Sequence, residues 1–303
     1  MGYWRPGKLI VIALICTVLQ TGCGGGGSSM TNPQPSPQPK PSGQIGHVFL
    51  VIEENHSFSE VIGNTSMPYF NSLASGNGLA TQYFADTHPS IGNYFVLTTG
   101  QVVTNNEVNP PITTVDNIVR ELVAAGKTWK SYAEGLPSVG YTGGDVGTYA
   151  QHHNPFALIS DVVNSSAQAS NMVPFTQFAT DLANKQLPQF SYIVPNQVDN
   201  AHDGTLAAAD AWLQANIDPL IKSSQFQTDG LLIITFDESD FTDLTHGGGH
   251  VATVIVGPTA KKGFQSTTLY QHESTLRLIL KSLGVTVFPG NAASAPDMTE
   301  FFQ

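Results

Sequence analysis

Short apolar runs alternate with helix-like patterns from about residue 44 to the C-terminus. The apolar runs are typical of strands that are buried on both faces of a parallel sheet, and they occupy residues 47–52, 79–84, 190–194, 231–236 and 251–256. Apolar positions recur at helical spacing in residues 115–125, 206–221 and 272–283, and the last segment stops before Gly284. This alternation predicts an α/β fold with a mostly parallel central sheet and helices on both faces.

Polar clusters adjoin several of these predicted strands. Glu53-Glu54-Asn55-His56 follows the first run, Pro195 to Asp203 follows the third, and Asp237-Glu238-Ser239-Asp240 follows the fourth, while His246-Gly-Gly-Gly-His250 precedes the last. Polar groups at the carboxyl ends of parallel strands meet at one edge of the sheet. Oxygen ligands beside imidazoles suit a divalent ion such as Mg²⁺, Ca²⁺, Mn²⁺ or Zn²⁺. Taken singly, Asp237-Glu238 is equally consistent with a solvated turn, and the triglycine with a flexible loop.

A nucleophile candidate lies in the segment Thr87-His88-Pro89-Ser90-Ile91-Gly92-Asn93-Tyr94. Pro89 restricts the backbone before the turn, and the apolar residues that follow predict that Ser90 opens a helix. A hydroxyl there lies at the positive end of the helix dipole beside free N–H groups, which favour an alkoxide and an incoming phosphate. The alternative is a plain serine N-cap, and the other polar clusters favour the phosphoryl-transfer interpretation.

Two further segments have open interpretations. His152-His153-Asn154-Pro155 is either a turn before a helix or part of a catalytic site. The glycine-rich residues 135–147 form either a long active-site loop or an ordinary surface loop.

Together the motifs resemble the phosphoesterase family of bacterial phospholipases C and acid phosphatases, in the alkaline phosphatase superfamily. The likeness extends in matching order from Gly46 to the C-terminus, and it rests on Glu54-Asn55-His56-Ser57-Phe58, the Thr-His-Pro-Ser-Ile-Gly-Asn-Tyr run, Pro195-Asn196 with His202-Asp203, Phe236-Asp237-Glu238 and Gly249-His250-Val251. The resemblance implies an alkaline-phosphatase-like fold and a phosphoric ester hydrolase.

The resemblance also implies roles for individual residues. Ser90 is implied as the nucleophile, Asn93 as the ligand of a phosphoryl oxygen, and a metal site is implied for Glu54, Asn55, Ser90, Asp237 and Glu238. An all-oxygen site of this kind favours a harder ion than zinc. A second cluster holds either another ion or a proton relay, and its members are Asp199, His202, Asp203 and His250.

The first 43 residues predict an exported protein. Residues 1–22 carry Arg5, Lys8 and a short apolar run, and they predict a lipoprotein-type signal peptide because the run is too short to span a bilayer. Thr21-Gly22-Cys23 resembles a lipobox, in which Cys23 is acylated and anchors the protein to a membrane. The alternative is cleavage without lipidation, which gives a secreted or periplasmic protein. Residues 23–43 read as a Gly/Ser/Pro-rich tether, and residues 44–303 as a single phosphoesterase domain.

Charge limits the partners. The chain has 12 Lys and Arg against 23 Asp and Glu, so loss of Arg5 and Lys8 leaves 10 minus 23, a net charge of −13 with neutral histidines. A negative field of this size repels nucleic acid. Arg120 and Arg277 are the arginines outside the signal peptide, and neither lies in a motif. Phosphate must therefore be held mainly by metal, Asn93, histidine and backbone N–H groups.

The sequence thus predicts a metal-dependent hydrolase of phosphate esters that works through a phosphoserine intermediate. We expect an acid-phosphatase-type phosphomonoesterase acting on a small-molecule or lipid substrate, with His202 or His250 protonating the leaving group. The alternatives are a phospholipase C-type phosphodiesterase and a non-catalytic binding lipoprotein. The oligomeric state is not predicted.

Overall fold

The computed structural model describes residues 1–3 and 45–303. The chain divides into two units, Met1–Lys40 and Pro41–Gln303. Cys23, the tether and nearly all of the predicted signal peptide lie outside the described residues. Within those residues no helix has the length and apolar character needed to cross a membrane.

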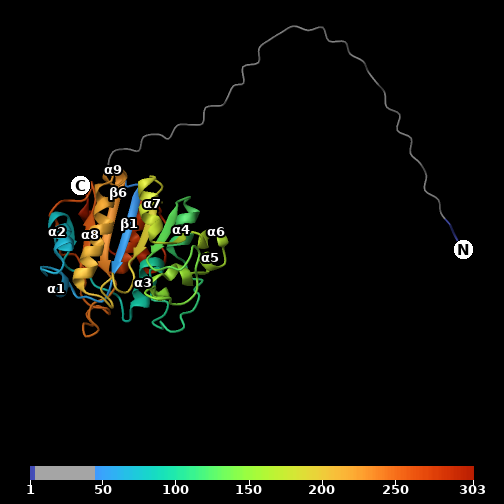
Figure 1. The fold of residues 1–303 in the computed structure, drawn as a ribbon, viewed down its shortest axis with the longest axis horizontal. Helices are drawn as coiled ribbons and strands as arrows, with labels where there is room; N and C mark the ends of the chain where they lie inside the picture. Colours follow the sequence, from blue (N-terminus) through green and yellow to red (C-terminus); the bar gives the residue numbers. More distant parts are fainter. Residues whose placement is uncertain (4–44) are drawn as a thin grey trace, which may run out of the picture. The chain divides into compact units, whose positions relative to one another are not determined.

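The second unit is built on a single eight-stranded sheet (Figure 1). The strand order is β4-β3-β5-β1-β6-β7-β2-β8. The strands are β1 His47–Glu53, β2 Gly78–Ala80, β3 Trp129–Ala133, β4 Met172–Pro174, β5 Phe190–Val194, β6 Gly230–Phe236, β7 Thr253–Val256 and β8 Gln265–Ser266. β7 pairs antiparallel with β6 and β2, and the other pairs are parallel. The mostly parallel α/β sheet is confirmed.

Helices cover both faces of the sheet. They are α1 Phe58–Val61, α2 Pro68–Gly76, α3 Ser90–Thr99, α4 Ile118–Ala124, α5 Ser160–Val163, α6 Ser166–Ala169, α7 Thr176–Ala183, α8 Leu206–Lys222, α9 Ser224–Asp229 and α10 His272–Ser282, with short 3-10 turns η1 Gln151–His153, η2 Pro155–Leu158, η3 Gly290–Ala293 and η4 Met298–Phe301. α3, α4 and α10 pack together in one group, and α2, α8 and α9 in another. In Figure 1, α7 and α8 flank β1 on the near side.

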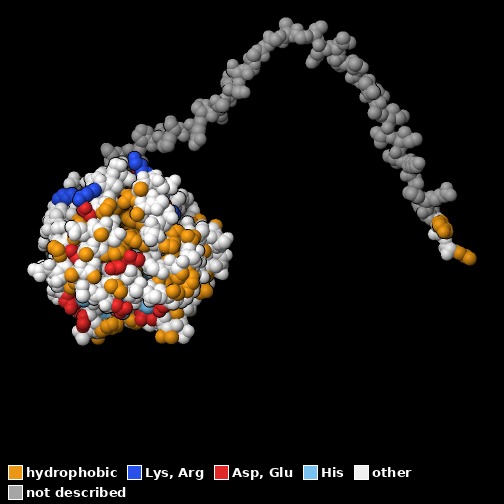
Figure 2. Space-filling model, in the orientation of Figure 1, with side chains coloured by type: hydrophobic (Ala, Val, Ile, Leu, Met, Phe, Trp, Pro, Cys, Tyr) orange, Lys and Arg blue, Asp and Glu red, His pale blue; other side chains and the backbone are white. Residues whose placement is uncertain are grey.

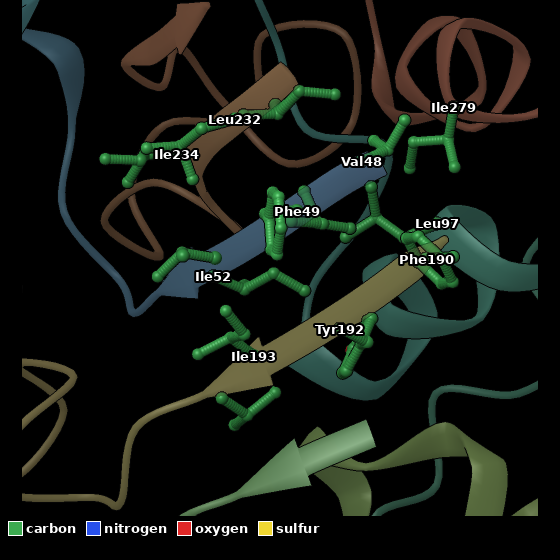
Figure 3. Packing of buried hydrophobic residues seen from close by; sticks show 14 of the residues in the cluster. Val48, Phe49, Ile52, Leu97, Phe190, Tyr192, Ile193, Leu232, Ile234 and Ile279 are labelled. Atoms are coloured by element: carbon green, nitrogen blue, oxygen red, sulfur yellow. The ribbon is translucent and has the colours of Figure 1, made fainter. Parts of the chain in front are cut away.

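The core follows from the continuous apolar strands. β1 lies between β5 and β6, with Val48 opposite both Phe190 and Leu231. Helices cover both faces of the sheet, so the side chains on both faces of β1 and β6 are buried. This explains why apolar and polar residues do not alternate along these two strands. Figure 3 shows side chains from β1, β5 and β6 in one cluster with Leu97 of α3 and Ile279 of α10.

Local signals set most element boundaries, and tertiary contacts moved some of them. α4 begins after Asn117, whose side chain accepts a hydrogen bond from Arg120 N, so the helix starts later than the apolar spacing from residue 115 predicts. The predicted strand at 79–84 is shorter, because β2 ends at Ala80. Tyr83 and Phe84 then make isolated bridges to Tyr270 and His250.

Candidate active site

The carboxyl ends of β1 and β6 meet the N-terminus of α3 at one edge of the sheet. Asp237, directly after β6, donates its backbone N–H to Glu53 O at 3.0 Å. Glu54, directly after β1, donates its N–H to Asn200 O at 2.9 Å in the loop after β5. The polar clusters after three central strands therefore come together, as the sheet-edge argument predicts.

Ser90 is the first residue of α3 and is 3 % exposed. Its hydroxyl oxygen lies 3.2 Å from Oε2 of Glu54 and 3.4 Å from Oδ1 of Asn55. Asn55 has a φ of 55°, a left-handed conformation that asparagine tolerates better than most residues. The turn after β1 therefore brings an amide oxygen and a carboxylate to the hydroxyl at the helix N-terminus.

Three carboxyl side chains near Ser90 are fully buried: Glu54, Asp237 and Glu238 are each 0 % exposed. Asp237 Oδ1 accepts the backbone N–H of Asn55 at 3.1 Å. Within residues 45–303, Oδ2 of Asp237 and Oε1 of Glu238 have no hydrogen-bond partner. Buried carboxylate oxygens without a partner are costly, so this arrangement calls for a cation or for protons.

The pKa values of all three carboxyl groups are raised. Burial raises the pKa of Glu54 well above its usual range, and the charge of Asp237 raises it further. Burial likewise raises the pKa of Asp237 to about 6, although hydrogen bonds from Ser90 and Asn55 oppose the shift. Burial, and then repulsion from Asp237, raises the pKa of Glu238 to about 10. A cation between these groups would stabilise their charged forms and so oppose all three shifts.

The residues fit a hard metal ion. In the part of the chain that the structure describes, His, Cys, Asp and Glu side chains form no group of three or more that could hold a metal ion by themselves. The donors around Ser90 instead combine carboxylates with the amide oxygen of Asn55 and the hydroxyl of Ser90. Such an all-oxygen set suits Mg²⁺ or Ca²⁺ better than zinc.

Asn93 is fully buried one turn into α3. Its Oδ1 accepts the backbone N–H groups of Asp86 at 2.9 Å and Thr87 at 3.2 Å. Its Nδ2 donates to Thr87 O at 2.8 Å and to Glu238 Oε2 at 3.3 Å. The amide thus holds the segment before Ser90 in place, and its binding of a phosphoryl oxygen stays a prediction.

His88 is a site residue that the sequence reasoning did not single out. Its Nδ1 lies 3.1 Å from Oε2 of Glu238, and its Nε2 donates to Asp243 O at 3.0 Å. Because Nε2 carries the proton for the carbonyl bond, the Nδ1 side of the ring is turned toward the Glu238 carboxyl. The signal was present in the sequence, since His88 lies two residues before Ser90.

Tyr94 binds the other oxygen of Glu54, and His153 lies next to it. The hydroxyl of Tyr94 donates to Oε1 of Glu54, and Nε2 of His153 lies 3.4 Å from the same atom. The His153 ring stacks on Tyr94 with centroids 4.9 Å apart. Burial, and then the neighbouring His152 and His202, keeps the pKa of His153 well below its usual range. The sequence left His152-His153 open between a turn and a catalytic role, and the structure brings His153 to the site.

The predicted second cluster is divided in the structure. Nδ1 of His202 lies 2.9 Å from Asp203 Oδ1, and the His202 ring lies 6.1 Å from that of His153, on the Glu54 side of the site. Asp199 accepts instead from the side chain of Asn196 at 2.8 Å.

His250 has different surroundings. Its ring stacks between Phe58 and Phe84, at centroid distances of 4.4 and 4.8 Å, and its Nε2 donates to Thr81 O at 3.0 Å. Burial lowers the pKa of His250.

The triglycine serves close backbone packing. A Cβ on Gly247 would lie 2.0 Å from Asp86 O, and one on Gly248 would lie 2.4 Å from Thr87 O. Gly248 N also donates to Ala85 O at 3.1 Å. These glycines let the loop after β6 pack against the backbone that leads to Ser90.

Known proteins share both the fold and the sequence. Solved structures that superpose include a member of the alkaline phosphatase superfamily from Vibrio parahaemolyticus, with a TM-score of 0.58 at 14% identity over 82% of this chain and 68% of that one. Another is the lipoteichoic acid synthase LtaP from Listeria monocytogenes, with a TM-score of 0.58 at 10% identity over 80% and 73%. At such identities the likeness shows the fold alone, and the fold is that of the alkaline phosphatase superfamily.

Sequence relatives define the chain more closely. The chain is 33% identical over 258 residues to a phosphatidylinositol-3-phosphatase of Mycobacterium tuberculosis, covering 84% of this chain and 82% of the relative. It is 32% identical to an acid phosphatase of Aspergillus fumigatus and 31% identical to a probable acid phosphatase of Kluyveromyces lactis, over 78% and 75% of this chain. The chain spans 54% and 56% of the length of those two relatives.

The fold and relatives together define a phosphoric ester hydrolase with an alkaline-phosphatase-like sheet. The family model of the phosphoesterase family matches residues 64–286, and the chain belongs to that family.

Proposed function

We propose that the protein is a metal-dependent phosphomonoesterase of the acid phosphatase type that forms a phosphoserine intermediate on Ser90. The observation that carries this proposal is the Ser90 hydroxyl at the start of α3, 3.2 Å from Glu54 Oε2 and 3.4 Å from Asn55 Oδ1. Beside it lie the buried, unpartnered oxygens Asp237 Oδ2 and Glu238 Oε1.

Glu54, Asn55, Ser90, Asp237 and Glu238 would hold one divalent ion. When bound, the ion would lower the pKa of the Ser90 hydroxyl and neutralise charge on the phosphoryl group. The carboxylates themselves repel a phosphate, so substrate binding requires this neutralisation.

Ser90 Oγ, after releasing its proton to solvent, attacks phosphorus in line, which forms the Ser90–phosphate bond and breaks the bond to the ester oxygen. The departing alcohol takes a proton from a histidine. We assign this role to His202 rather than His250, because His202 is exposed beside Asp203, whereas His250 is stacked between two phenylalanines. Neutral His202 then accepts a proton from the water that attacks phosphorus. The bond between phosphorus and Ser90 Oγ breaks, inorganic phosphate leaves, and the Ser90 oxygen is restored.

The names of the relatives support a phosphatase over a diesterase, since each is called a phosphatase. The relative from Mycobacterium tuberculosis also supports a phosphorylated lipid as one substrate class.

One substrate comparison tests the proposal. The protein is loaded in turn with Mg²⁺, Ca²⁺, Mn²⁺ or Zn²⁺ and assayed with p-nitrophenyl phosphate, bis-p-nitrophenyl phosphate and p-nitrophenylphosphorylcholine. We expect turnover of the monoester and its loss in Ser90→Ala. The control is Ser138→Ala, which changes an exposed serine and should retain turnover. Preferential turnover of either diester would establish the phosphodiesterase instead, and no turnover with any ion would favour the binding lipoprotein.

We also propose that the protein is exported and anchored through an acylated Cys23. The support is the Thr21-Gly22-Cys23 sequence followed by a Gly/Ser/Pro-rich segment.

A further inference from the structure

Exposed apolar side chains are concentrated on four segments near Ser90, which we call the rim loops: residues 101–112, 135–149, 195–205 and 239–249. Val108 is 86 % exposed, Leu244 70 % and Phe241 59 %. Val102, Val146 and Val198 are also exposed, at 42–46 %. Figure 2 shows hydrophobic side chains on the segments that project at the lower edge of the view, with acidic side chains beside them.

Hydrogen bonds tie two of the rim loops to the backbone around Ser90. In the first loop, Glu107 Oε1 accepts Ile91 N at 3.2 Å. In the last loop, Asp243 O accepts from His88 at 3.0 Å, and the Phe241 ring lies 5.2 Å from the His88 ring. The apolar tips therefore lie around the site and are held in a fixed relation to it.

The other two rim loops are tied to each other. Gln197 N donates to Thr148 O at 3.0 Å. His202 belongs to this pair of loops, and its ring lies 6.1 Å from that of His153, the neighbour of Glu54. The site is thus bordered by apolar tips on several sides.

The rim loops are acidic. They contain no Lys or Arg, whereas their acidic residues are Glu107, Asp145, Asp199, Asp203, Asp240 and Asp243. A surface of this composition is repelled by anionic lipid headgroups and tolerates zwitterionic ones. The single apolar side chains are separated by polar residues and glycines, so they form no continuous face of the kind that a stable protein interface buries. Separate apolar tips suit a lipid surface, because acyl chains can fill the space between them.

We propose that the rim loops dock onto a zwitterionic lipid surface, with Val108, Phe241 and Leu244 entering the boundary between headgroups and acyl chains. Docking brings Ser90 to phosphate monoesters displayed on that surface, so the inference rests on the proposed function and narrows its substrate to membrane lipids. The N-terminal anchor would hold the protein at a membrane, and the rim loops would set the orientation of the site.

The test uses the full chain with Cys23→Ser in every version, so that no acyl chain contributes. Flotation with phosphatidylcholine vesicles, and with mixed phosphatidylcholine and phosphatidylserine vesicles, measures partitioning. The test variant is Val108→Ser with Leu244→Ser, because both side chains are largely exposed to solvent. The control is Val123→Ser with Val287→Ser, which are 47 % and 55 % exposed. Val123 lies near the C-terminal end of α4, and Val287 follows α10, whose opposite end is at the site, where His272 Nε2 donates to Asp237 O.

We expect the unaltered rim to bind phosphatidylcholine vesicles more strongly than the mixed vesicles. The test variant should lower partitioning into phosphatidylcholine by about tenfold, the effect of losing two inserted side chains, and the control should not. Hydrolysis of soluble p-nitrophenyl phosphate should be equal in all versions.

Equal partitioning of the test and control variants would overturn the inference. A dimer in gel filtration that dissociates only in the test variant would also overturn it, because a second copy would then be the occupant. Failure of the proposed function is distinguishable, since it would appear as absent p-nitrophenyl phosphate hydrolysis in the unaltered protein, whatever the vesicle result.

Discussion

Nε2 of His153 lies 3.4 Å from Oε1 of Glu54, the carboxylate whose other oxygen faces the Ser90 hydroxyl. Tyr94 donates a hydrogen bond to the same Oε1, so one oxygen of Glu54 is fixed by Tyr94 and the other faces Ser90. Tyr94, against which the His153 ring stacks, therefore positions Glu54 without occupying the atom that faces Ser90.

Tyr94→Phe should lower both metal affinity and turnover by about 10–100-fold, because loss of the hydroxyl frees the Glu54 carboxylate to rotate. The measurements are metal titration by calorimetry and steady-state kinetics with p-nitrophenyl phosphate. Tyr132→Phe is the matched control, since its buried hydroxyl bonds Asp181 at 2.7 Å on a different part of the sheet. Equal loss of metal affinity in both variants would show that Tyr94 acts only through stability.

Acid quench during turnover should trap phosphate on Ser90. The reason is that phosphoserine is formed by direct attack and its ester bond survives acid. Peptide mass spectrometry after incubation with p-nitrophenyl phosphate checks this, with Ser90→Ala as the blank. A phosphate found on another residue, or turnover near normal in Ser90→Ala, would refute the nucleophile assignment.

Chelation should abolish turnover, and added Mg²⁺ or Ca²⁺ should restore it. Asp237→Ala should weaken metal binding by several kcal/mol, on the order of 10²-fold or more, because it removes a buried charged donor. Asp243→Ala is a suitable control, since that carboxylate caps the loop at Thr245 and His250 rather than facing Ser90. Full activity in protein shown to be metal-free by elemental analysis would contradict metal dependence.

The free energy of unfolding should fall as pH rises, because the pKa of Asp86 is raised in the folded protein. Burial, and then repulsion from Glu273, raises the pKa of Asp86 from 3.8 to about 9 in the folded protein. The folded state therefore binds more protons than the unfolded state between these values, and this contribution, complete below pH 4, is lost as pH rises through about 9. Asp86→Asn should flatten the dependence of Tm on pH between 4 and 9 by about 5 °C or more, as differential scanning calorimetry would detect. An unchanged slope would show that the pKa of Asp86 is not raised in the folded protein.

Cys23→Ser should release active protein from the membrane or leave an unprocessed precursor. Acylation of Cys23 would supply more than one chain, which anchors stably, whereas one chain alone binds only marginally. Detergent partitioning and intact-mass analysis of the mature N-terminus distinguish these states. If the mature N-terminus begins after Cys23 in a host that processes lipoproteins, a secreted enzyme is the correct description.

The sequence determined by itself the elements whose signals are local. Continuous apolar runs at β1, β5 and β6 are legible because both faces of these strands are buried, and Gly284 after α10 ends a helical pattern. Ser90 at the start of α3 was also predictable, because proline and the apolar residues after it act within one turn. The gathering of Glu54, Asn55 and Asp237 followed from the rule that parallel strands share a carboxyl edge.

Only the tertiary structure decided which side chains meet. His250 and His202 both lie within two residues of a glycine in the sequence, but Phe58 and Phe84 from distant segments enclose the ring of His250. β3 pairs with β5, and β5 pairs with β1, which Glu54 follows. The segment after β3, which includes η1, therefore brings His153 to Glu54. Contacts between residues about 100 positions apart depend on strand order and packing, and no local pattern encodes either of these.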